Sequence, residues 1–192
     1  MENIVLLILA GGRATRMGGI DKGLAEFRQL PLINHVLKQL PATYFEQRWI
    51  SANRNIEHYQ TLVDQVLSDP IEHQFSGPLA GILAALNQLA PHQKLAVAPC
   101  DSPFVEFELY QQLHQRLLAT QDSNVAVAAD SEGRPQPVFA LLRPQAKVAI
   151  AAALREGENK IMYAYKKAGV TKVSARDDQW FINLNHLDDL LA

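Results

Sequence analysis

One short segment of the chain has the residue types that bind polyphosphates. Residues 9–22, LAGGRATRMGGIDK, contain four glycines, two arginines and a lysine. Glycine permits positive φ values and a close backbone approach, so that N–H groups can face phosphate oxygens. Arg13, Arg16 and Lys22 would add positive charge beside those oxygens. We interpret residues 9–22 as a phosphate-binding loop, called the glycine-rich loop below, with an ordinary surface loop as the alternative.

The spacing within the glycine-rich loop excludes the two most common phosphate-binding patterns. The Walker A pattern needs GxxxxGK[ST], whereas Lys22 follows Asp21 and precedes Gly23. The dinucleotide pattern GxGxxG is also absent, because the glycines occur as the pairs Gly11-Gly12 and Gly18-Gly19. The loop therefore belongs to a third type.

Two aspartates follow apolar runs and are candidates for ligand binding. Asp101 ends the run LAVAPCD, residues 95–101, and Asp69 lies in LSDP after a shorter run. A carboxylate after a buried strand is well placed for Mg²⁺, which prefers oxygen ligands and commonly keeps water and substrate phosphates. The structural alternatives are an N-cap for Asp101, before a helix start near Pro103, and an Asx-turn for Asp69.

The elements that would carry these residues alternate between short apolar runs and amphipathic stretches. This alternation is typical of βαβ units around a parallel sheet, where ligands bind at the carboxyl ends of strands. The pattern predicts the α/β class: a single doubly wound, Rossmann-like domain of residues 1–192, with a mostly parallel sheet and helices on both faces.

The positions of the expected elements follow from apolar periodicity and from proline and glycine. Strands are expected at residues 4–9, 48–52, 65–67, 95–98, 125–129, 138–142, 170–173 and 180–182. Helices are expected at residues 31–40, 56–63, 78–89, 105–119, 145–155 and 160–168, and from about residue 187.

Composition and charge exclude several classes of protein. The 192 residues are 48% hydrophobic with a net charge of −2, which gives no reason to expect a nucleic-acid partner. The apolar run at residues 5–10 is too short for a signal peptide or a membrane span, so we expect a cytoplasmic protein without a membrane partner. Cys100 is the single cysteine and is interpreted as a small buried residue, and the histidines lack the paired spacing of a zinc site.

The motif LAGG-x3-RMGG-x-DK resembles the signature of the nucleotidyltransferases that load nucleotides onto the molybdenum cofactor, closest to the MobA-type guanylyltransferases. The resemblance covers almost the full chain, because five family segments occur in family order. These are the glycine-rich loop, Asp69, GPLAG at residues 77–81, CDSP at residues 100–103 and FINLN at residues 181–185.

The resemblance implies transfer of GMP from GTP to the terminal phosphate of molybdopterin, usually with molybdenum bound, and release of pyrophosphate. It also implies Mg²⁺ as the cofactor. The attacking group is a phosphate monoester with a second pKa of about 6, so it is already largely ionised at pH 7. No general base is then required, and the protein must align two polyanions and neutralise their charge.

The resemblance also implies roles for individual residues. In the family, the glycine-rich loop and the strand ends bind the nucleotide, a carboxylate holds the metal, and two amides meet the pterin. Ser51 stands where the family commonly has the first Asn of Asn-x-Asn, and its hydroxyl can still hydrogen-bond. We therefore expect Arg16, Lys22 and Asp101 to be catalytic and Asp101 to be the metal ligand. The expected nucleotide contacts are Leu9, Ala10, Gly11, Gly12, Lys22, Ser51, Asp69 and Asp101.

Asn183 and Asn185 are expected to contact the pterin. They occupy alternate positions of an extended segment and would point the same way, and a pterin edge offers mixed donors and acceptors to amides. Asn185 is also expected to cap the terminal helix. The N-terminal part would thus bind the nucleotide and the C-terminal part the molybdopterin.

Three alternatives stay open from the sequence. The first is a cytidylyltransferase of the same cofactor pathway, since base choice depends on a few loop residues. The second is a nucleotidyltransferase acting on sugar phosphates or isoprenoid precursors. The third is a nucleotide-binding module without turnover. The oligomeric state, the mono- or bis-dinucleotide product and the involvement of cofactor-delivery proteins are likewise open.

Overall fold

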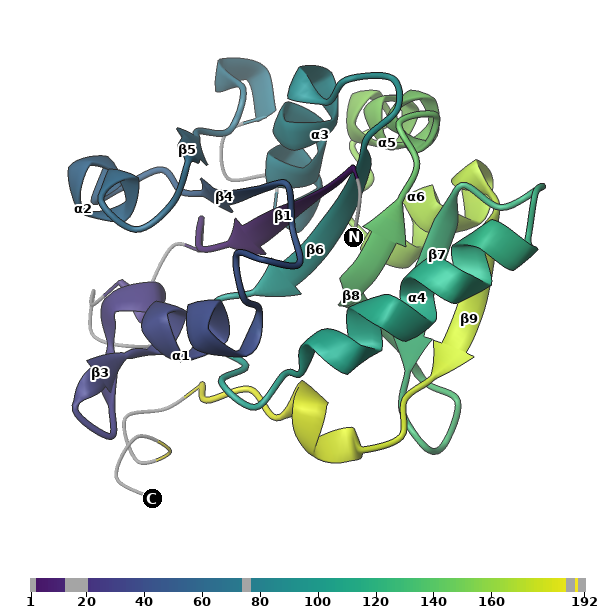
Figure 1. Ribbon diagram of the computed structural model, residues 1–192. Coiled ribbons are helices and arrows are strands. Elements are labelled where there is room, and N and C mark those ends of the chain that lie inside the picture. Colours follow the sequence, from purple (N-terminus) through teal and green to yellow (C-terminus); the bar gives the residue numbers. More distant parts are fainter. Residues whose placement is uncertain (1–2, 13–20, 74–76, 186–188, 190–192) are drawn as a thin grey trace.

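A seven-stranded sheet runs through the protein in the order β5-β4-β1-β6-β8-β7-β9 (Figure 1). The computed structural model describes residues 3–12, 21–73, 77–185 and 189. The strands lie where the apolar runs predict them, within two or three residues. They are β1 (Ile4–Leu9), β4 (Gln47–Ser51), β5 (Gln65–Leu67), β6 (Lys94–Pro99), β7 (Val125–Ala129), β8 (Pro135–Leu142) and β9 (Val170–Ser174).

The sheet is mostly parallel, as predicted, and β8 is the exception. β1 pairs in parallel with β4 and β6, and β7 pairs in parallel with β9. β8 runs antiparallel to β6 and to β7. A hairpin between β7 and β8, through residues 130–134, produces the reversal.

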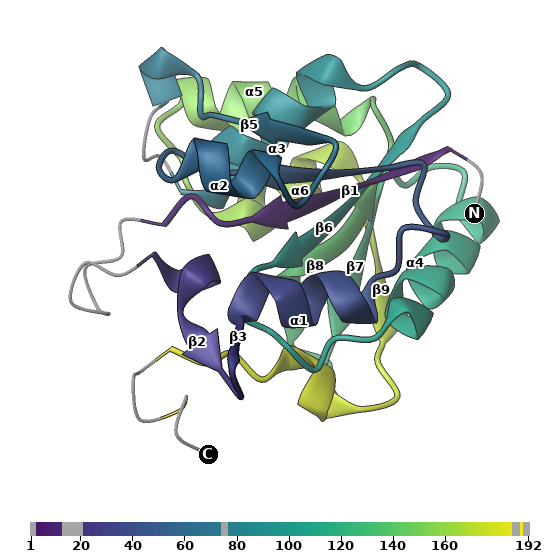
Figure 2. The same ribbon diagram turned by 60° about the vertical axis from the view of Figure 1, so that its left-hand side comes forward.

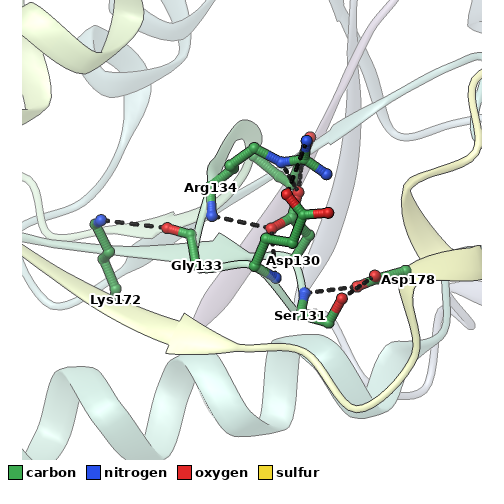
Figure 3. Close-up of polar contacts among 8 residues, drawn as sticks. Asp130, Ser131, Gly133, Arg134, Lys172 and Asp178 are labelled. Carbon is green, nitrogen blue, oxygen red and sulfur yellow. Dashed lines mark hydrogen bonds and ion pairs between the residues drawn. The ribbon is translucent and has the colours of Figure 1, made fainter.

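The hairpin is organised by a buried carboxylate, as Figure 3 shows. Asp130 accepts hydrogen bonds from the backbone N–H groups of Glu132 (3.0 Å) and Arg134 (2.9 Å) and from Arg134 Nε (2.8 Å). Next to it, the backbone N–H of Ser131 donates to Asp178 Oδ1 at 2.8 Å. The hairpin therefore also anchors the chain that follows β9.

Helices cover both faces of the sheet, which confirms the doubly wound class (Figure 1). The alternating side chains of β1 show the division: Ile4, Leu6 and Ile8 pack into one core, while Val5 and Leu7 pack into the other. The first core includes α1 (Leu32–Gln39) and α4 (Phe107–Ala119), and the second includes α3 (Pro78–Gln88), α5 (Ala146–Arg155) and α6 (Ile161–Ala168).

Short elements form a third, smaller cluster below the sheet. The 3-10 turn η2 (Lys22–Leu24) leads into a two-stranded hairpin of β2 (Glu26–Phe27) and β3 (Leu30–Pro31). Figure 2 shows the C-terminal chain passing beside this hairpin. The contact is apolar, because Leu184 is buried in the cluster. Its other members are Ala25, Phe27, Leu32 and the partly buried Phe104.

One predicted strand is wrong. Residues 180–182 do not join the sheet, and the 3-10 turn η4 (Asp178–Phe181) stands there instead. The Asp177 side chain caps the turn by accepting from the Gln179 N–H, and Trp180 is buried in the first core, so its apolar character serves packing rather than strand pairing. The helix predicted from residue 187 lies outside the described residues.

Two predicted helices differ from the structure by two or more residues at one end. The helix α2 (Ile56–Gln60) ends three residues before the predicted boundary, where Thr61 Oγ1 donates to the His58 carbonyl. The helix α4 begins at Phe107 rather than at residue 105. Among the described helices, none has the length and hydropathy needed to cross a bilayer.

Two buried tyrosines allow a matched test of the core. The Tyr110 hydroxyl donates to the Val97 carbonyl at 2.7 Å, whereas the Tyr165 hydroxyl has no hydrogen-bond partner among the described residues. We expect Tyr110→Phe to lower the free energy of unfolding by about 1–3 kcal/mol, because the carbonyl loses its donor. Tyr165→Phe should leave stability unchanged or raise it. Urea unfolding measures both, and an equal loss in the two variants would contradict this packing.

Candidate active site

The strand ends bring the predicted site residues to one edge of the sheet. In the sheet register, Leu9 lies beside Ser51 on one side and beside Pro99 on the other. After β1 the chain builds β4 and β5 on one side, and it then returns through α3 to place β6 on the other (Figure 1). Strand order therefore reverses at β1, which is where α/β sheets bind their ligands.

An ion pair joins the glycine-rich loop to the end of β6. Lys22 Nζ contacts Asp101 Oδ2, and the two side chains are 25% and 13% exposed. Lys22 Nζ also donates to Asn185 Oδ1 at 2.6 Å. Three residues that the sequence singles out, from three distant parts of the chain, thus meet at one point.

Asp101 has a carboxylate oxygen that could bind a metal ion. Its Oδ1 atom is buried and has no hydrogen-bond partner among the described residues. Within those residues no three His, Cys, Asp or Glu side chains gather into a metal site. A cation here would have one carboxylate and would complete its shell with phosphate oxygens and water, a common arrangement for Mg²⁺. The capping alternative is wrong, because α4 begins later and its N-cap is Glu106.

The segment at residues 181–185 runs directly beside Asp101. The Leu184 N–H donates to the Asp101 carbonyl at 3.0 Å, and the Ser102 hydroxyl donates to Asn183 Oδ1. Since Asn185 accepts from Lys22, both amides face site residues while Leu184 packs into the small cluster. The alternation predicted for this segment is therefore present.

Asp69 is held at the end of β5 by a residue that follows β4. Asn53 Nδ2 donates to Asp69 Oδ2 at 2.7 Å, and the Asp69 N–H donates back to Asn53 Oδ1 at 2.9 Å. Asn53 consequently does not cap α2, whose N-cap is Asn55. A Cβ on Gly11 would lie 3.3 Å from Asn53 Nδ2, so this pair borders the glycine-rich loop.

Ser51 is buried between two glycines of the predicted motifs. Its side chain is 2% exposed, and its carbonyl accepts the Ala10 N–H at 2.8 Å. A Cβ on Gly81 would lie 2.2 Å from Ser51 Oγ, which requires glycine at this point of GPLAG. The small side chain at position 51 and the glycine in α3 thus fit each other. The predicted contact of Ser51 with a nucleotide remains a prediction.

The two described ends of the glycine-rich loop are tied to the chain after β4. Arg54 Nη2 donates to the Gly12 carbonyl at 3.2 Å. At the other end, the Asp21 carboxylate accepts from Asn55 Nδ2 (2.8 Å) and from the Tyr59 hydroxyl (2.6 Å). Arg13, Arg16 and the pair Gly18-Gly19 lie outside the described residues.

Sequence reasoning missed Asp21, Arg54, Asn55 and Tyr59. Asp21 is the aspartate of the motif LAGG-x3-RMGG-x-DK, but the motif gives it no role of its own, and no motif includes Arg54, Asn55 or Tyr59. The interpretation of Cys100 is confirmed: the residue is buried, and burial raises the pKa of its thiol. A thiol that stays protonated is a poor nucleophile.

Known sequences resemble this chain over almost its full length. The family model of the MobA-like NTP transferase domain matches residues 6–170. A molybdenum cofactor guanylyltransferase of Burkholderia ambifaria is 41% identical over 99% of this chain and 95% of its own length. Another, of Cupriavidus metallidurans, is 40% identical over 98% of this chain and 93% of its own length.

Solved structures share the fold at lower identity. Molybdopterin-guanine dinucleotide biosynthesis protein A of Archaeoglobus fulgidus superposes with a TM-score of 0.77 at 23% identity, covering 97% of this chain and 95% of that one. A 4-diphosphocytidyl-2C-methyl-D-erythritol synthase of Anaerococcus prevotii reaches 0.71 at 10% identity, covering 98% and 95%. The sequence matches and the shared fold together show that the chain belongs to the MobA-like NTP transferase family.

Proposed function

We propose that the protein transfers GMP from GTP to the terminal phosphate of molybdopterin, with or without bound molybdenum, and releases pyrophosphate. The observation that carries the proposal is the meeting of Lys22, Asp101 and Asn185 at the reversal of strand order. Relatives named molybdenum cofactor guanylyltransferase, matched over nearly their whole length, support the choice of substrates.

The reaction requires neutralisation of phosphate charge and does not require a general base. The attacking phosphate of molybdopterin is largely ionised at neutral pH, with a second pKa of about 6, and can attack the α-phosphate directly. What slows the reaction is the approach of two polyanions. Lys22 supplies a cation at the site, and we assign the same role to Arg16, whose planar guanidinium can bind phosphate bidentately.

Asp101 is the residue that would hold Mg²⁺, because its buried Oδ1 has no partner among the described residues. Bound there, the metal would withdraw charge from the triphosphate and stabilise the pyrophosphate as it leaves. Lys22 forms an ion pair with the other carboxylate oxygen of Asp101. The triphosphate offers Lys22 stronger anionic partners.

The nucleotide would lie over the ends of β1, β4 and β5. We assign its base, ribose and phosphate contacts to Leu9, Ala10, Gly11, Gly12, Ser51 and Asp69, together with the two site residues Lys22 and Asp101. Asp69 is already oriented by Asn53, and the backbone at Ala10 is fixed by Ser51. Pre-organised contacts of this kind lower the entropic cost of binding the nucleotide.

The pterin would lie on the opposite side of Asp101, against the C-terminal part of the chain. We assign Asn183 and Asn185 to it, and we propose one domain over residues 1–192 that divides in this way. Asn185 also accepts a hydrogen bond from Lys22, which supports our proposal that it lies between the two substrates. The pterin is labile, so we further propose that proteins which deliver or receive the cofactor bind this side, and that the reaction takes place in the cytoplasm, where GTP is available.

The first test is a nucleotide panel. With molybdopterin and Mg²⁺ present, pyrophosphate release should be at least about tenfold faster, or about 1.4 kcal/mol lower in barrier, with GTP than with CTP, ATP or UTP. The Anaerococcus relative shows that this fold also occurs in a cytidylyl-named protein, so the base must be measured. Preference for CTP would replace the proposal by the cytidylyl alternative. Binding of GTP without pyrophosphate release would leave a non-catalytic module.

The second test removes the proposed metal ligand. Asp101→Ala should lower kcat by about 10²–10⁴-fold, because metal-based charge stabilisation contributes several kcal/mol. Asp122→Ala is the matched control, since Asp122 is exposed in the turn before β7. Both variants should keep the wild-type circular dichroism spectrum. Near-normal turnover by folded Asp101→Ala would show that Asp101 is a structural residue.

The third test separates the two substrates. Asn183→Ala should raise the KM for molybdopterin roughly tenfold and leave the Kd for GTP unchanged, since one unpaired polar group costs about 1–3 kcal/mol. Asn87→Ala, on the exposed face of α3, serves as the control. Weakened GTP binding with normal use of molybdopterin would place Asn183 on the nucleotide side instead.

A further inference from the structure

Asp21, the residue before Lys22, is a buried carboxylate with a role that the reaction scheme above does not use. It is 9% exposed and accepts three hydrogen bonds. The donors are the Gly23 N–H at 3.2 Å, Asn55 Nδ2 at 2.8 Å and the Tyr59 hydroxyl at 2.6 Å. All three donors are neutral, so the carboxylate is stabilised in the interior by direction-specific hydrogen bonds.

Tyr59 reaches Asp21 from the core. The tyrosine is fully buried, and a Cβ on Gly23 would lie 2.5 Å from its hydroxyl oxygen, so Gly23 is required by the close approach. Burial, followed by the hydrogen bond to Asp21, raises the pKa of Tyr59. The hydroxyl therefore stays protonated at neutral pH and keeps donating.

Asn55 completes the arrangement from the lead-in to α2. Its backbone is left-handed, with φ of 51°, a conformation that asparagine tolerates better than most residues. Asn55 is exposed while its amide reaches the buried carboxylate. One short segment, residues 55–59, thus donates a hydrogen bond to each carboxylate oxygen of Asp21.

The backbone around Lys22 is fixed as a result. The Leu24 N–H donates to the Asp21 carbonyl at 3.0 Å, and the Ala25 N–H donates to the Lys22 carbonyl at 3.2 Å. Four methylenes join the Lys22 ammonium to this backbone, so the backbone position limits the space that the ammonium can reach. From this fixed point, Lys22 reaches Asp101 and Asn185.

We propose that Asp21, gripped by Asn55 and Tyr59, is a positioning residue for Lys22. Asp21 does not touch the substrate; it sets the backbone from which the Lys22 ammonium reaches the phosphates. An apolar residue at position 21 would fill the space at lower desolvation cost, but it would lack the three directional bonds. The inference rests on the proposed function only for what Lys22 contacts during turnover.

The variants are chosen to remove one hydrogen bond at a time. Tyr59→Phe removes the hydroxyl and keeps the ring. Asn55→Gly removes the amide and keeps the left-handed backbone, on an exposed residue where folding is not at risk. Tyr110→Phe is the matched control, because it also deletes a buried hydroxyl with one acceptor, the Val97 carbonyl, away from Lys22.

The first readout needs no substrate. Trace acetic anhydride labels each lysine of the folded protein, and mass spectrometry gives the rate for each site. In Tyr59→Phe and in Asn55→Gly, Lys22 should be acetylated about threefold faster than in the wild type. Each variant loses one hydrogen bond to Asp21, and a loss of that size shifts the equilibrium between the held and the free Lys22 ammonium by a factor of several. Lys94 should keep its rate, and Tyr110→Phe should change neither. Unchanged Lys22 labelling in both variants would overturn the proposal.

The second readout is a double-mutant cycle on kcat/KM for GTP. Tyr59→Phe should lower this constant by about tenfold or more, since small misplacements of a charge-stabilising group are costly. In a Lys22→Ala background the same change should have little effect, within about twofold, because Tyr59 acts through Lys22. Equal factors in both backgrounds would overturn the proposal. Turnover of the wild type alone decides the proposed function, so the two failures are distinguishable.

Discussion

The contact between the Lys22 ammonium and the Asp101 carboxylate is the interaction on which the site depends. It joins the end of the glycine-rich loop to the end of β6, and through Asn185 it joins both to the C-terminal segment. A half-buried ion pair is stable only where further hydrogen bonds compensate for lost hydration. Among the described residues the buried Asp101 Oδ1 atom has no hydrogen-bond partner, which supports the proposal that this carboxylate binds a cation.

The rest of the fold brings these groups together and holds them. Parallel pairing of β1 with β6 sets the loop beside Asp101. Glycine permits close approach at two points, Gly81 against Ser51 and Gly23 against Tyr59. Burial of Leu184 next to β2 and β3 pulls the C-terminal segment onto the site. Each of these features is a local packing contact. Together they orient the side chains of Lys22, Asp101 and Asn185 toward one point.

The strands, the helix faces and the site edge could be predicted because they depend on local patterns. Buried runs such as residues 4–9 mark strands, and the rule for strand ends places Asp101 beside the glycine-rich loop. The turn at residues 178–181 could not be predicted. The apolar residues 180–182 resemble a short strand in the sequence, and only the packing of Trp180 into the first core shows that they are not one. The role of Asp21 could not be predicted either, because two of its three donors, Asn55 and Tyr59, lie 34 and 38 positions away along the chain.

On the proposed function, GTP binds with its α-phosphate and its metal at Asp101. A crystal structure with Mn²⁺ and a GTP analogue that resists transfer tests it most directly, because the anomalous signal locates the metal without assumption. We expect a manganese peak bound to an Asp101 carboxylate oxygen and to phosphate oxygens, with the Lys22 ammonium against the triphosphate. A metal and triphosphate bound away from Asp101, with the Lys22–Asp101 pair intact, would contradict it.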